Sequence, residues 1–284
     1  ITSSEALENE GSFWGGLGSQ NQRTVGAKAS VALSDSLSLK MGIQKNDSDG
    51  FFFNPNLGDH TSKRNELFAN MGWIKEFGKN LLKVSHIFGE NKNGNDLWNT
   101  DGSFTVLSDK LGKDDQTTHG HSIELTGPLS DQTHYLLIGS YSHSDQVVSY
   151  DEDWNSNDFW NTVPGWNRDY DFFRSYNRRK VNLHLKSILQ HRWDRLDFSY
   201  GLHYYQKTEE TDVNSFRNSM LRSALFADFV SDKVALLTNI SYQFSKKSRI
   251  NLSNRIEHQE IQYFDTNGFQ SLKSNTPMAF NLLY

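Results

Sequence analysis

The sequence predicts an all-β protein, an antiparallel up-and-down transmembrane β-barrel, and three observations support this prediction. Apolar and polar residues alternate with a period of two along most of the chain, whereas helical periodicity is almost absent. The segments that link the alternating runs are short and long in turn, as in outer-membrane barrels. The 284 residues also combine 36% hydrophobic residues with 13% aromatic residues. A barrel strand needs only one apolar face, so this fold accounts for a composition that is polar yet rich in aromatic rings.

The composition excludes several other classes of protein. The chain has no cysteine, which rules out a disulfide scaffold and a cysteine zinc site. The 29 basic and 34 acidic residues leave a formal net charge of −5, so no nucleic-acid partner is expected. No apolar run approaches the roughly 20 residues that a membrane helix needs. The common hydrolase, metalloprotease and phosphate-loop motifs are also absent, and we expect no enzymatic activity.

The alternating runs follow one another in order along the chain. The first two cover 25–33 and 37–44 and are joined by a short link at 34–36. Later runs of the same kind lie around 66–73, 181–186, 196–204, 234–244 and 250–256. Since successive side chains of a strand point to opposite faces, each run has one apolar and one hydrophilic face.

The links between these runs differ in length at the two ends of the strands. Short links are expected at 34–36, 77–79, 129–131, 193–194, 230–232 and 245–247, and long polar loops at 46–63, 91–117, 144–176 and 206–215. This division gives about 12 strands of ~10–14 residues, and a tilted membrane crossing needs about 9–11. Aromatic residues near the strand ends would form girdles in the outer-membrane lipid. The alternative, a soluble sandwich or jelly roll, predicts shorter strands and loops of similar length at both ends.

Three stretches of sequence resemble a known family in their order and spacing. The first is GSQNQRTVG at 18–26 with LSDSLSLK at 33–40, and the second is NDSDGF at 46–51 with LGD at 57–59 and RNE at 64–66. The third is YSHSD at 141–145 with YDEDW at 150–154. Together they resemble the first half of the barrel of TonB-dependent outer-membrane receptors.

The resemblance implies that residues 1–284 are a partial β-barrel domain, with about 12 strands of a plugged barrel of about 22. The family's plug domain would then lie upstream and its remaining strands downstream. The implied function is active uptake of a scarce nutrient across the outer membrane of a Gram-negative bacterium. The nutrient would be a ferric siderophore, a cobalamin-like cofactor or a carbohydrate. The implied partners are outer-membrane lipid, the protein's own plug domain, the TonB–ExbB–ExbD energising complex and a small-molecule substrate, with no cofactor.

Two other functions remain open from the residues alone. A passive porin or a complete small outer-membrane barrel would use the same strand pattern with an open lumen. A soluble β-rich ligand-binding module would share the alternation without a membrane. Detergent dependence of the native protein separates the two membrane readings from the soluble one.

The expected loop 144–176 is the richest candidate for ligand binding. Aromatic rings interleaved with acids and an arginine suit stacking and hydrogen bonding to a planar or sugar-like ligand. The candidate ligand-binding residues are Tyr150, Asp151, Asp153, Trp154, Trp160, Trp166, Arg168 and Tyr170. The alternative is that these aromatic rings pack the long loop onto itself or onto neighbouring loops.

No metal site is expected, although two groups of residues contain suitable ligand atoms. Clustered oxygens suit Ca²⁺, and the acidic residues of this region are Asp145, Asp151, Glu152, Asp153 and Asp158. Their spacing does not fit an EF-hand, and a solvated acidic loop is the preferred interpretation. His119 and His121 share one strand face, with His134 on the next strand, but the sequence places no third ligand beside the pair. Isolated histidines facing the lumen are expected instead.

Overall fold

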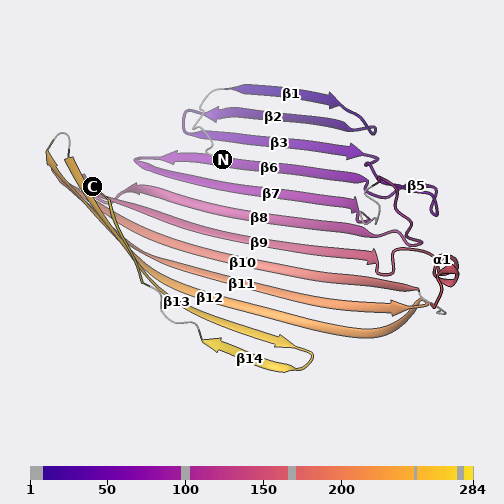
Figure 1. Ribbon diagram of the computed structural model, residues 1–284. Helices are drawn as coiled ribbons and strands as arrows, with labels where there is room; N and C mark the ends of the chain where they lie inside the picture. The colour runs from indigo at the N-terminus through magenta and orange to yellow at the C-terminus, as the bar shows by residue number, and fades with distance from the viewer. Residues whose placement is uncertain (1–8, 97–102, 166–170, 246–247, 274–277, 284) are drawn as a thin grey trace.

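The computed structural model of the protein describes residues 9–96, 103–165, 171–245, 248–273 and 278–283. These residues form one large antiparallel sheet of 13 strands, which curves like part of the wall of a barrel (Figure 1). Along the sheet, each long strand pairs with the next long strand in the sequence. The all-β class and the up-and-down order predicted from the sequence are therefore confirmed.

The sheet begins with β1 (Glu10–Leu17), β2 (Arg23–Ser34), β3 (Leu37–Ser48), β6 (Arg64–Phe77), β7 (Asn80–Gly94) and β8 (Lys113–Pro128). It continues with β9 (Thr133–Asp151), β10 (Phe172–Trp193), β11 (Leu196–Arg217), β12 (Met220–Ser245) and β13 (Ser248–Asp265). The last two strands, β14 (Gly268–Lys273) and β15 (Met278–Leu283), pair with different parts of β13. Because β14 and β15 share one position, the described sheet has 12 positions, the number that the sequence predicts.

Two small elements lie outside this sheet, in the loops. The hairpin of β4 (Phe53–Asn54) and β5 (Asp59–His60) follows β3, and helix α1 (Asn157–Thr162) follows β9. Figure 1 places the hairpin and the helix at the same end of the strands.

Among the described residues, no helix is both long enough and apolar enough to cross a membrane.

The described connections at one end of the strands are all short, as expected, but only three of those at the other end are long. At the first end, β2 and β3, β6 and β7, β8 and β9, and β10 and β11 are joined by short turns at 35–36, 78–79, 129–132 and 194–195. At the second end, β1 and β2, β11 and β12, and β13 and β14 are joined by short turns at 18–22, 218–219 and 266–267. The long loops cover 49–63, 95–112 and 152–171. Each loop is shorter than predicted because the flanking strands continue into it.

Two of the expected connections are wrong. The segment 206–215 is not a loop but part of β11, which has 22 residues, and 230–232 is not a turn but lies within β12, which has 26 residues. Both faces of β11 are polar here, so this part of the strand carries no apolar alternation in the sequence. Ion pairs with neighbouring strands hold it, including Arg178–Glu209 at 3.3 Å. Within β12, Asp232 Oδ1 accepts hydrogen bonds from the Tyr204 hydroxyl (3.0 Å) and from Gln206 Nε2 (2.9 Å).

One face of the sheet is apolar and exposed. A single register row on this face carries Leu82, Leu125, Leu137, Ser187, Leu202, Leu236 and Ile256. The Leu202 side chain is 58% exposed. Among the described side chains, the only buried hydrophobic ones are Val106 and Ala235. Such an apolar surface without a core beneath it is what the lipid-facing wall of a barrel requires.

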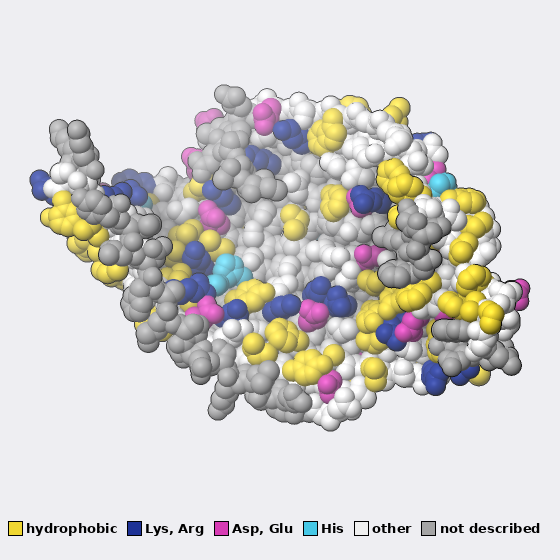
Figure 2. All heavy atoms as spheres, viewed as in Figure 1, with side chains coloured by type: hydrophobic (Ala, Val, Ile, Leu, Met, Phe, Trp, Pro, Cys, Tyr) yellow, Lys and Arg dark blue, Asp and Glu magenta, His cyan; other side chains and the backbone are white. Residues whose placement is uncertain are grey.

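The opposite face is hollowed and polar, and Figure 2 looks onto it. Small and polar side chains cover most of this concave face, and charged side chains cross it in a row (Figure 2). The charges include the pairs Lys83–Glu124 (3.5 Å) and Lys233–Glu257 (3.9 Å). A polar inner face fits a lumen that holds water or a plug.

The apolar side chains of the exposed face form a band, and this band crosses the register rows obliquely. Met41 and Met71 lie in one row, and the same row reaches polar residues at Gln206 and Asp232. On β12 the apolar side chains of this face resume at Val234, nearer the tight turns. Strands tilted by about 35–45° to the barrel axis produce such a shift from strand to strand.

Candidate functional site

A cavity of about 470 Å³ lies at the loop end of β10 and is the best candidate for ligand binding. Its lining combines aromatic, basic and acidic side chains from the β9–β10 loop and from three strands. The lining residues are Glu152, Asp153, Trp154, Trp160, Phe172, Arg174, Ser215, Arg222 and Ser223. Rings, charges and small hydroxyl groups around one cavity suit a small ligand that has both flat and charged parts.

Local hydrogen bonds hold the loop side of this cavity. Ser156 caps helix α1 by accepting a hydrogen bond from the Phe159 N–H (3.3 Å). One turn later, the Trp160 indole N–H donates to the Asp153 carbonyl (3.1 Å). The base of the loop is closed by the Phe172 N–H, which donates to Asp153 Oδ2 (3.2 Å). The cap and these two contacts place the Trp160 ring over the start of β10.

The strand side of the cavity is basic. Arg174 forms an ion pair with Glu152 and lies within 3.5 Å of the Tyr176 hydroxyl. The guanidinium groups of Arg217 and Arg222 lie over the Phe172 ring, at 5.7 and 5.9 Å from its centroid. Guanidinium groups bind carboxylates, phenolates and phosphates with paired hydrogen bonds and also stack on flat rings. The cavity is therefore suited to an anionic ligand with aromatic parts.

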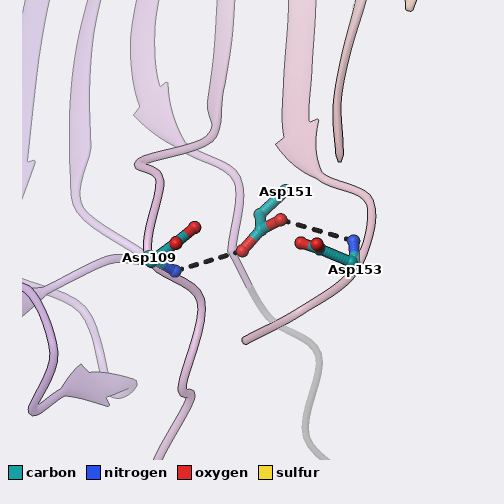
Figure 3. Close-up of side chains that lie close together, drawn as sticks. All are labelled: Asp109, Asp151 and Asp153. Atoms are coloured by element: carbon teal, nitrogen blue, oxygen red, sulfur yellow. Dashed lines mark hydrogen bonds between the residues drawn. The ribbon is translucent and has the colours of Figure 1, made fainter. Parts of the chain in front are cut away.

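Three carboxylates meet behind the cavity, and Figure 3 shows Asp109, Asp151 and Asp153 facing one another. Their ligand atoms lie within 4.8 Å of one another, and the Asp151 and Asp153 residues are only 3% and 4% exposed. Asp151 accepts hydrogen bonds from two backbone N–H groups, those of Asp109 (3.1 Å) and Asp153 (3.3 Å). Burial and the neighbouring Asp153 carboxyl raise the pKa of Asp151 to about 8. Burial also raises the pKa of Asp109 and of Asp153.

This cluster differs from the acidic set considered from the sequence. Asp151 and Asp153 come together, but their third member is Asp109, which lies in the preceding long loop. Asp145 and Glu152 pair instead with Arg179 (3.2 Å) and with Arg174. Clustered carboxylate oxygens could hold a hard cation such as Ca²⁺. Protonation of one carboxyl relieves the same repulsion, and the raised pKa values point to protonation.

The structure brings together part of the candidate site named from the sequence. Asp153, Trp154 and Trp160 line the cavity, and Asp151 lies behind them in the carboxylate cluster. Tyr150 lies on β9 and stacks against Tyr176, with 6.2 Å between the ring centroids. The remaining three candidates, Trp166, Arg168 and Tyr170, lie outside the described residues. Ligand binding by all eight stays a prediction.

Six lining residues were not among the candidate ligand-binding residues named from the sequence, namely Glu152, Phe172, Arg174, Ser215, Arg222 and Ser223. Phe172 and Arg174 share a strand face with Tyr176 at the start of β10, so extending the strand five residues into the expected loop 144–176 would have found them. Arg222 could not be found in this way. Its place depends on the pairing of β11 with β12 beyond residue 206, where the sequence predicts a loop.

The raised pKa of Asp151 predicts a pH dependence of loop stability. Since its pKa of about 8 exceeds the ordinary value of 3.8, the protonated carboxyl favours the folded loop. This contribution is complete below the ordinary pKa and is lost as the pH rises through about 8. A tenfold difference in proton affinity between the folded and the open loop is worth about 1.4 kcal/mol, so we expect a loss of a few kcal/mol of local stability.

The measurement is hydrogen exchange of the loops at 103–112 and 152–165 between pH 5 and pH 9. In Asp151→Asn, the loss of loop stability between pH 5 and pH 9 should be much smaller, because the amide does not ionise. Asp158→Asn changes an acid on helix α1 that lies outside the cluster and is the matched control. Equal pH dependence in the wild type and in Asp151→Asn would contradict this account.

A second polar cluster ties the two preceding loops together. The Asn54 side chain is completely buried, and its amide donates to Ser108 O (2.8 Å), Ser108 Oγ (2.9 Å) and Asp96 Oδ2 (3.3 Å). Its oxygen accepts hydrogen bonds from the N–H groups of Asn56 (2.9 Å) and Leu57 (3.1 Å). Asn54 thus joins the 49–63 loop to the 95–112 loop, which also carries Asp109.

No family model and no curated protein matches this sequence. Its fold, however, is that of part of the barrel of TonB-dependent outer-membrane receptors, as the resemblance implied. The ferric yersiniabactin uptake receptor FyuA from Yersinia pestis matches with a TM-score of 0.76 and 12% identity, over 99% of this chain and 44% of that receptor. The closed form of the ferric-catecholate import receptor Fiu from Escherichia coli K12 matches with a TM-score of 0.71 and 12% identity, over 98% and 47%.

The pyoverdine receptor FpvA from Pseudomonas aeruginosa PAO1, solved with pyoverdine bound, gives a TM-score of 0.69 at 9% identity. The match covers 98% of this chain and 44% of FpvA. This chain therefore spans less than half the length of each of these three structures. These similar structures are transport receptors rather than enzymes.

Proposed function

We propose that this chain is part of a TonB-dependent receptor that takes up a ferric siderophore across the bacterial outer membrane. The observation that carries the proposal is the cavity at the loop end of the concave face, where Arg174 and Arg222 lie beside Trp154, Trp160 and Phe172. Iron chelates built from catecholates or carboxylates carry negative charge and flat rings. Such ligands match both the guanidinium groups and the aromatic rings of the cavity.

The two guanidinium groups of the cavity favour this substrate class over a neutral carbohydrate. A neutral carbohydrate gains little from two guanidinium groups, and its recognition depends on stacking and neutral hydrogen bonds. The experiment below would also reveal uptake of a carbohydrate or of a cobalamin-like cofactor.

The proposed partners follow from the same class of receptor. A plug domain would occupy the lumen and contact the row of lysine, arginine and glutamate side chains on the concave face. The TonB–ExbB–ExbD complex would supply the energy for transport. Outer-membrane lipid would contact the apolar face that carries Leu202 and Leu236.

The experiment is growth of the source bacterium under iron limitation, with its own siderophores deleted and single ferric siderophores supplied. Deleting the gene should abolish growth on one of them, and the intact gene should restore it. Deleting tonB should have the same effect. Normal growth of the gene deletion on every ferric siderophore, with loss of growth on a sugar or a cobalamin, would overturn the proposed substrate class. Uptake that persists without TonB would indicate a passive porin.

A further inference from the structure

Four of the chain's 10 histidines lie together on the apolar face of three neighbouring strands. His86 is on β7, His119 and His121 are on β8, and His143 is on β9. His86 pairs in register with His121, and His119 pairs with His143. Since the pairs are two residues apart along β8, all four side chains point to the same side of the sheet.

This arrangement corrects the expectation from the sequence. The lumen-facing orientation expected for His119 and His121 is wrong, because both belong to the same face as the exposed apolar side chain Ile123. The sequence also placed His134 near the pair, but His134 pairs with Gln190 near the tight turns and belongs to the other face. The structure instead places His86, on the preceding strand, beside His121.

The two central imidazoles are almost in position to share one ion. The Nδ1 atoms of His86 and His121 lie 3.1 Å apart, and their ring centroids lie 4.4 Å apart. Two ring nitrogens that bind one tetrahedral Zn²⁺ at 2.0–2.1 Å each are about 3.3 Å from one another. The ring centroid of His119 lies 6.0 Å from that of His86 and 5.1 Å from that of Phe88, so His119 would have to change rotamer to join the pair as a ligand.

We propose that His86, His121 and His119 form a binding site for a divalent transition metal on the outer surface of the barrel wall. Neutral imidazole nitrogens suit Zn²⁺, Cu²⁺ and Ni²⁺, and three of them leave a further position open to water or to an anionic group. The ion would link β7 to β8 at the loop-side edge of the apolar band. His143 lies beside the site. Its Nε2 atom is 3.3 Å from Asp145 Oδ2, so His143 already has a carboxylate partner.

This site is separate from the proposed uptake function. The three histidines are on the outer face of the wall, whereas the cavity with Arg174 opens on the concave side. A metal bound by His86 and His121 would therefore be a resident of the barrel wall and not the transported cargo.

The test uses the full receptor, purified in detergent and freed of metal. Zn²⁺ binding is measured by isothermal titration calorimetry, and Co²⁺ is added separately to record the visible absorption of a tetrahedral site. We expect one Zn²⁺ per receptor. Binding should weaken at least tenfold in His86→Ala and in His121→Ala, and several-fold in His119→Ala. His134→Ala is the matched control and should bind as the wild type does.

A second variant separates a metal site from a simple hydrogen bond between the two rings. His121→Asn keeps a side chain that can hydrogen-bond to His86 but removes a good metal ligand, so Zn²⁺ binding should be lost. The barrel should stay folded, which normal heat-modifiable mobility on gels would show. Unchanged Zn²⁺ binding in the His86→Ala/His121→Ala double variant would overturn the proposal. So would a wild-type receptor that binds no Zn²⁺ at micromolar concentrations. Growth on the ferric siderophore should be normal in all these variants, whichever way the proposed function is decided.

Discussion

In the proposed uptake receptor, replacing Arg174 with alanine should lower the affinity for the transported ligand, and its uptake at limiting concentration, by about ten- to a hundredfold. A hydrogen bond to a charged group contributes about 1.5–3 kcal/mol, which corresponds to this range. The substitution also leaves Glu152 without its ion-pair partner at the wall of the cavity, where its charge would repel an anion. The expected order of affinities is wild type, then Arg222→Ala, then Arg174→Ala, since Arg222 is the more exposed of the two.

The measurement is uptake of the iron-55 complex of the siderophore that the growth assay identifies. Arg195→Ala removes an arginine from the tight turn at the opposite end of β10 and is the matched control. Arg174→Lys keeps the charge but loses the paired geometry of the guanidinium, so it should restore uptake only in part. Equal uptake by Arg174→Ala and Arg195→Ala would show that the ligand binds elsewhere.

The second large effect concerns the loops that support the cavity. Asn54→Ala removes five hydrogen bonds from a fully buried site and takes the amide donor away from Asp96 and from the Ser108 carbonyl. Each buried polar group left without a partner costs about 1–3 kcal/mol, so we expect a loss of about 3–5 kcal/mol in the local stability of both loops.

Limited proteolysis of the receptor in detergent measures this loss, because cleavage reports how often the loops open. Asn54→Ala should be cut faster by at least a hundredfold within 49–63 and 103–112, with the barrel itself intact. Asn239→Ala removes an asparagine on the wall of the barrel, whose side-chain oxygen accepts a hydrogen bond from Ser253 Oγ (2.7 Å), and should behave as the wild type. Similar cleavage of both variants would mean that Asn54 does not hold the loops together.

The sequence was sufficient to predict the fold wherever each strand has one apolar face. The runs that contain Met41, Met71 and Leu202 show the alternation clearly, and the tight turns between strands follow from it. The prediction failed at 206–215 because a strand that lies beyond the lipid is wet on both faces. Such a strand is recognised by its cross-strand pairs, such as Arg178 with Glu209, and these pairs cannot be read from a single run of residues.

The candidate site could be predicted only where its residues are close in the sequence. Asp153, Trp154 and Trp160 belong to one loop, and the richness of that loop in rings and acids was enough to identify them. Asp109 and Arg222 come from other loops and strands, and the fold alone brings them to the same place. The pairing of His86 with His121 was missed for the same reason, since 35 residues separate the two rings.

The length of β10 sets the electrical environment of the cavity. The continuous apolar run on the outward face of this strand ends at Val181, and Arg174 lies seven residues nearer the loops. Seven residues span about 23 Å along a strand, or about 16 Å in height after tilting. The field of anionic lipid headgroups falls off within a Debye length of about 8 Å at physiological ionic strength. In the proposed receptor, a negatively charged ligand would thus approach Arg174 beyond the reach of the membrane's own repulsion.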